Sequence, residues 1–212
     1  MKLPLFSFEK VKLRDRKLVS VETAELVSVV LDPFIVTIIS IGVILNSVSL
    51  SYLGRLWWFG LFILIAVLPT VLYVLISMKT GKIHDWFLSN RAERYKVLAV
   101  SLASLLLLNI VVVFGHAPFL FTVFVRSALL QAVVLALITL FWKISFHSSF
   151  YTSFASAMMI VFGSRAAWLF LFLPLIWWSR NRLGKHTWGQ LVVGAAVAAV
   201  TVWGVFWVHG YR

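Results

Sequence analysis

The stretch VLAVSLASLLLLNIVVVFGHAPFLFTVFVRSALLQAVVLALITLFW, residues 97–142, decides the fold class. It holds two apolar runs of about 20 residues, the length at which an α-helix crosses a hydrocarbon layer roughly 30 Å thick. The sequence Gly115-His116-Ala117-Pro118 separates them, and glycine and proline end helices. The stretch therefore predicts two membrane-spanning helices joined by a tight turn.

The composition of the whole chain agrees with a lipid environment. Of 212 residues, 62% are hydrophobic and 12% are charged, which leaves too little polar surface to cover a water-soluble domain. The chain has no cysteine, so disulfides, thiolate zinc sites and cysteine nucleophiles are excluded. The net charge of +12 sits in loops between apolar runs and not on a soluble basic module, which argues against a nucleic-acid partner.

Similar runs before and after this stretch predict an all-α bundle of six to seven membrane-spanning helices. The basic residues 1–32 form an N-terminal cytoplasmic or interfacial segment without the pattern of a removable signal peptide, and residues 33–212 form one transmembrane domain. Asp32-Pro33 is typical of a helix start. The expected spans are 33–53, 56–78, 97–114, 119–142, a hairpin of 150–162 with 166–178, and 187–208.

Counting these crossings places the N-terminus and three polar segments, residues 79–96, 143–149 and 179–186, on one membrane face. Most lysines and arginines lie on this face, so the positive-inside bias predicts that it is cytoplasmic. We expect an integral protein of a prokaryotic plasma membrane.

The three polar segments have the composition of a phosphate site. They bring together arginines and two histidines, namely Arg91, Arg94, His147, Arg180 and His186. Guanidinium groups match phosphate oxygens, and nearby helix N-termini add backbone amides. One imidazole can attack phosphorus while the other protonates the leaving oxygen. No DxxD or HExxH spacing is present, so we expect neither a metal nor another cofactor.

These segments resemble the motifs of the type 2 phosphatidic acid phosphatase superfamily of membrane lipid phosphatases. Its third motif, S-R-x5-H-x3-D, is similar to Ser179-Arg180, His186 and Gln190, with glutamine in place of aspartate as in dolichyldiphosphatase-like members. Its second motif, P-S-G-H, is similar to residues 144–147, which keep Ser145 and His147. Its first motif, K-x6-R-P, is represented most weakly, by Lys82 with Arg91 or Arg94.

The resemblance implies a role for each of these residues. His186 would be the nucleophile that forms a phosphohistidine, His147 the acid for the leaving alcohol, and Gln190 the residue that orients His186. The substrate-binding residues would be Arg91, Arg94, Arg180, Lys82 and Ser145. The substrate would be a membrane lipid phosphate or an isoprenoid diphosphate, which the glutamine variant mildly favours.

Two other functions remain open from the sequence. The missing aspartate and the degenerate first two motifs allow a non-catalytic lipid-phosphate binder or transporter. A transferase that passes the phosphoryl group to an acceptor other than water is the third possibility.

Other charged residues have simpler interpretations. Arg182 and Lys185 are expected to set topology, and His116 and His209 to lie at the opposite interface. Arg126 either snorkels toward that interface or contacts Asp32 or a substrate.

Overall fold

The computed structural model describes residues 16–86, 88 and 90–211, and over these residues the chain is helical without a strand. Five helical segments are long and apolar enough to cross a membrane, and the bent pair Ser20–Val30 with Pro33–Asn46 would make a sixth. The prediction of an all-α membrane-spanning bundle is confirmed. Residues 1–15 of the expected N-terminal segment lie outside the described residues.

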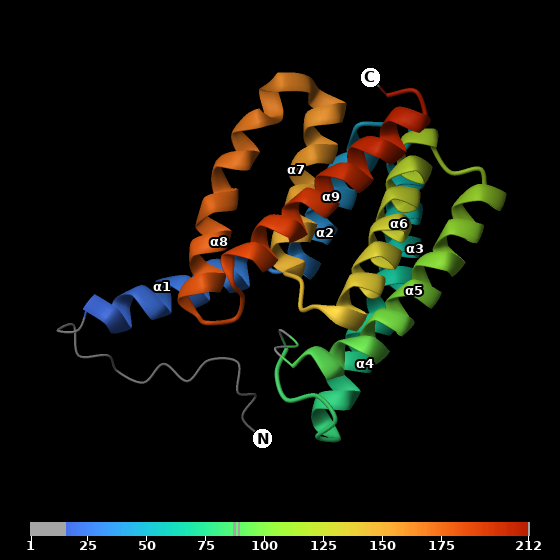
Figure 1. Cartoon of the computed structure of the whole chain (residues 1–212). Helices are drawn as coiled ribbons and strands as arrows, with labels where there is room; N and C mark the ends of the chain where they lie inside the picture. Colours follow the sequence, from blue (N-terminus) through green and yellow to red (C-terminus); the bar gives the residue numbers. More distant parts are fainter. Residues whose placement is uncertain (1–15, 87, 89, 212) are drawn as a thin grey trace.

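The helical elements follow one another with short connections or none (Figure 1). They are α1 (Arg16–Val30), α2 (Pro33–Asn46), α3 (Tyr52–Phe62), the π-helix η1 (Ile63–Val67), α4 (Leu68–Lys79), α5 (Arg91–Phe114), α6 (Phe119–Phe141), α7 (Phe146–Phe162), the 3-10 helix η2 (Gly163–Phe172), α8 (Leu173–Arg182) and α9 (Trp188–Val208).

Side-chain caps start helices at residues other than those expected from the sequence. The first span ends at Asn46 and not at residue 53, because Ser51 caps a new helix by accepting a hydrogen bond from the Gly54 amide. The third span begins at Arg91 and not at residue 97, because Asn90 accepts from the Ala92 amide. Arg91 and Arg94 therefore belong to the first turn of a membrane helix.

The expected hairpin is present. Figure 1 shows α7 running to the far end of the bundle and η2 with α8 returning beside it. The reversal occurs at Gly163, whose φ of 70° lies in the left-handed region that favours glycine. The hairpin therefore begins and ends at the same end of the bundle.

All three polar connections lie at one end of the bundle in Figure 1, together with α1. They are the segment before α5, the link from α6 to α7 and the link from α8 to α9. Helix α1 packs against α8 at this end. The common face predicted from the count of crossings is present.

Candidate functional site

Two histidines and two arginines meet at this end of the bundle. Arg94 is in α5, His147 is in the first turn of α7, Arg180 is near the end of α8, and His186 is in the link before α9. The side chains are almost fully buried, with 1% of Arg94, 4% of His147, 1% of Arg180 and 6% of His186 exposed. The charges of both arginines act on both histidines. We call these four residues the His–Arg cluster.

His186 is positioned by the cap of α9. The side-chain oxygen of Gln190 lies 3.1 Å from Nδ1 of His186 and also accepts a hydrogen bond from the Thr187 amide at 3.2 Å. Since this oxygen can only accept, Nδ1 of His186 carries the proton and Nε2 keeps its lone pair. The contact expected between Gln190 and His186 is therefore present.

The surroundings keep His186 neutral. Burial lowers the pKa of His186 to about 3, and the positive charges of Arg94, Arg180 and Lys143 act in the same direction. The hydrogen bond with Gln190 partly offsets them. At neutral pH the imidazole is thus available as a nucleophile or base.

His147 contacts helix α1, which the sequence analysis did not include in the site. Its Nε2 lies 3.2 Å from the carbonyl oxygen of Ser28, which accepts the hydrogen bond. The hydroxyl of Ser28 lies 3.0 Å from Nη1 of Arg180 and 2.8 Å from Oγ of Ser179. Ser28 therefore ties the second and third motifs together, and no spacing in the sequence indicated this.

Arg94 is partly used by the fold itself. Its Nε donates to the carbonyl of Leu88 at 2.8 Å and its Nη1 to the carbonyl of Ile144 at 2.7 Å. The guanidinium also lies 4.6 Å from the ring centre of Phe146. Arg94 thereby fixes the chain just before both α5 and α7.

The remaining predicted binding residues are not part of the His–Arg cluster. Ser145 caps α7 by accepting from the Ser148 amide at 3.4 Å, which accounts for its buried hydroxyl. Arg91 donates to the carbonyl of Leu140 at 3.1 Å near the surface. Lys82 is exposed. Neither Arg91 nor Lys82 is among the charges that act on the two histidines.

A different lysine lies near the cluster. Lys143 is half-buried, and its pKa is lowered by burial and by the positive charges of Arg94, Lys185 and Arg180. Asp85 is the nearby carboxylate whose charge acts on both Arg94 and Arg180. The sequence signal for Lys143 was its place two residues before Ser145, in the same polar segment.

Three seryl and tryptophan contacts hold α7, α8 and α9 together behind the cluster. The hydroxyl of Ser148 donates to the carbonyl of Leu191 and accepts from Nε1 of Trp177, both within 2.8 Å. Ser149 donates to the carbonyl of Gly194 at 3.0 Å. These residues join the three helices by hydrogen bonds.

Residues at the opposite end do not join the cluster. Nη1 of Arg126 lies 2.8 Å from Nε2 of His209. The alternative contact between Arg126 and Asp32 is wrong, because Asp32 caps α2 through the Phe34 amide and accepts from Nε1 of Trp86. Among the described residues, no group of three or more His, Asp or Glu side chains is placed to hold a metal ion.

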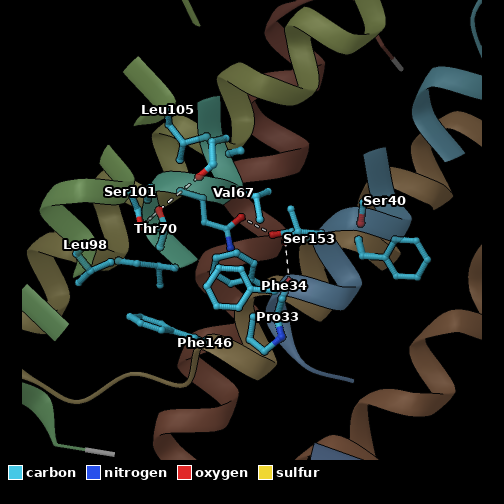
Figure 2. Close-up of a pocket in the computed structure, with 18 of the residues that line it drawn as sticks. Pro33, Phe34, Ser40, Val67, Thr70, Leu98, Ser101, Leu105, Phe146 and Ser153 are labelled. Carbon is cyan, nitrogen blue, oxygen red and sulfur yellow. Dashed lines mark hydrogen bonds between the residues drawn. The ribbon is translucent and has the colours of Figure 1, made fainter. Parts of the chain in front are cut away.

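An apolar cavity of about 180 Å³ lies beside the cluster, within the bundle. His147 and Phe146 are in its wall, and α2, α5, α6 and α7 supply most of the rest. In Figure 2 the side chains of Phe34, Phe146 and Ser153 approach it from two helices. The charged cluster thus borders a space suited to a hydrocarbon chain.

Comparisons of this chain with models of protein families, with curated proteins and with solved structures gave no match.

Proposed function

We propose that the chain is an integral membrane hydrolase that removes phosphate from a lipid phosphate or an isoprenoid diphosphate. The support is one observation: two histidines and two buried arginines, drawn from segments far apart in sequence, meet at the polar end of a membrane bundle beside an apolar cavity. A phosphate held by the arginines would face both imidazoles, while the lipid chain would occupy the cavity.

The reaction would proceed in two displacements. Nε2 of His186 attacks phosphorus, the bond from phosphorus to the lipid oxygen breaks, and the imidazolium form of His147 gives a proton to that oxygen. Water then attacks the phosphohistidine, the P–N bond breaks, His147 takes a proton from the water, and His186 returns to its neutral form. Arg94 and Arg180 stabilise the charge that develops on the phosphate oxygens.

Gln190 has a positioning role in this scheme. Its oxygen holds the Nδ1 proton of His186, so that Nε2 is the atom free to attack. An amide provides this orientation without the charge of a carboxylate. The phosphate itself then supplies the negative charge that favours an imidazolium.

The site would face the cytoplasm. The segments that carry it, together with the N-terminal segment, hold most of the basic residues, and positive charge is retained on that side of a membrane. A prokaryotic plasma membrane is the proposed location.

The deciding experiment measures phosphate release by the purified protein in detergent with EDTA present. The substrates are phosphatidate, phosphatidylglycerol phosphate, and farnesyl or undecaprenyl diphosphate. We expect turnover by the wild type, a fall in kcat of roughly 10⁴-fold or more for His186→Ala, and a fall of about 10²- to 10⁴-fold for His147→Ala.

The matched control is His84→Ala. His84 lies at the same end of the bundle, but it is exposed and contacts Glu93 at 2.7 Å. This variant should keep wild-type activity. If the wild type binds these lipids and releases no phosphate from any of them, the cluster is a receptor or transport site and the proposal is wrong.

A further inference from the structure

The cavity contains one polar side chain that its apolar surroundings do not explain. Gln131 is in α6, lines the cavity, and is only 5% exposed. Its side-chain oxygen accepts a hydrogen bond from the hydroxyl of Ser153 in α7. Among the described residues, no group accepts a hydrogen bond from its amide nitrogen. This amide nitrogen is therefore a hydrogen-bond donor available to a ligand bound in the cavity.

The hydroxyl groups in the cavity wall differ from the Gln131 amide, because the chain itself provides their hydrogen-bond partners. Ser127 donates to the carbonyl of Phe124 at 2.9 Å, and Ser40 donates to that of Val36 at 2.7 Å. Thr70 contacts the hydroxyl of Ser101 at 3.2 Å, as Figure 2 also shows. Gln131 is therefore the donor in this wall that has capacity left for a ligand.

The distance from the cluster restricts what that ligand is. His147 and Ser153 are both in α7 and six residues apart, which corresponds to roughly 9 Å along the helix. In a glycerolipid phosphate, about six covalent bonds join phosphorus to an ester carbonyl oxygen, which is roughly 7 Å when extended. A phosphate beside His147 thus places an ester carbonyl within reach of Gln131. An isoprenoid chain has no acceptor there.

We propose that the cavity binds the acyl-ester segment of a glycerolipid and that the Gln131 amide donates a hydrogen bond to an ester carbonyl. Ser153 fixes the orientation of the amide by donating to its oxygen. The aromatic wall deeper in the bundle, including Phe62 and Phe124, surrounds the acyl chain beyond the ester. The position of phosphorus rests on the proposed phosphatase function. The hydrogen bond to the ester carbonyl then favours an acyl glycerolipid over an isoprenoid as the substrate.

The first test compares matched substrates that differ in this carbonyl. Phosphatidate with ester-linked chains and its ether-linked analogue are hydrolysed by wild type, Gln131→Leu and Ser127→Ala proteins. We expect kcat/KM of the wild type to favour the ester by roughly 10-fold, the value of one hydrogen bond. Gln131→Leu should remove this preference, because its kcat/KM on the ester should fall by about 10-fold toward the value on the ether. Ser127→Ala should keep the preference.

A second measurement needs no hydrolysis. Thermal unfolding is followed in detergent with diacylglycerol or with dialkylglycerol, both of which lack phosphate. Diacylglycerol should raise the Tm of the wild type more than dialkylglycerol does, and Gln131→Leu should abolish the difference.

The two measurements separate the two proposals. Selective stabilisation by diacylglycerol without any phosphate release would support the ester site and overturn the phosphatase. Phosphate release with equal rates on ester and ether, and equal stabilisation by the two glycerols, would overturn the ester site alone. If Gln131→Leu does not fold, the comparison of ester with ether substrates in the wild type still decides whether the ester site exists.

Discussion

The imidazole of His186 is held by the amide of Gln190, at the position where the motif that residues 179–190 resemble has a carboxylate. The oxygen of Gln190 serves two donors, the Thr187 amide and Nδ1 of His186, so the same side chain caps a helix and orients the proposed nucleophile. The resemblance of residues 179–190 to the third motif implied that Gln190 would orient His186. That the same oxygen caps α9 was visible only in the structure.

A carboxylate at this position should change the pH dependence of activity. Gln190→Glu keeps the acceptor geometry and adds a negative charge that favours protonated His186, so its pKa should rise from about 3 by about 1 to 3 units. His186 acts in its neutral form, and activity is lost below its pKa. The acidic limb of kcat/KM should therefore move to higher pH in a pH–rate profile.

The uncharged variant Gln190→Met is the control for this prediction. It removes the acceptor without adding charge, so its acidic limb should not move upward. An identical limb in Gln190→Glu and wild type would mean that His186 does not control the profile.

Which arginines face the cluster depended on details that the sequence did not reveal. Arg94, Arg180 and both histidines were predicted and lie together, whereas Arg91 and Lys82 do not join them. Helical phase decides this, and the Asn90 cap starts α5 six residues earlier than expected. The contribution of α1 was missed because Ser28 acts through its carbonyl and a small hydroxyl, which carry no distinctive pattern.

Among the elements, α7 and α9 pack along each other behind the cluster. Small residues of α9 allow this packing, and Gly194 and Ala198 are buried. A β-carbon at Gly194 would lie 2.9 Å from the carbonyl oxygen of Ser145 and 3.0 Å from Oγ of Ser149. The glycine thus lets α9 approach the cap that positions His147.

Substitution of this glycine should loosen the pair. Gly194→Ala should lower the free energy of unfolding by about 1 to 3 kcal/mol, because the backbone at Ser145 must move. Gly204→Ala in the same helix is the matched control, since no atom lies within 4 Å of its added carbon. Thermal unfolding in detergent measures both. Equal stability of the two variants would contradict the close approach.

For the molecule as a whole, apolar length and the count of crossings were enough to predict the fold class and the common polar end. Span length is set by the bilayer, so a sequence carries this information directly. Exact helix boundaries were not predictable where a single serine or asparagine ends one helix or starts another, as at residues 46–51.

The orientation in the membrane is testable because the chain contains no cysteine. Single cysteines replace Lys82, exposed at the polar end, and Ser47, exposed in the link between α2 and α3. Expressed in a bacterial inner membrane, Ser47→Cys should react with an impermeant maleimide in spheroplasts, and Lys82→Cys only in inverted vesicles. The reverse pattern would place the His–Arg cluster on the outer side.

The cavity beside His147 continues from the charged end into the bundle, and this has a consequence for what the reaction leaves behind. A lipid bound with its phosphate at the cluster and its chain in the cavity belongs to the leaflet on that side. The two products would then be sorted by their solubility: inorganic phosphate returns to the adjoining aqueous compartment, and the dephosphorylated lipid stays in the same monolayer. The turnover would change the surface charge of one leaflet and leave the other untouched.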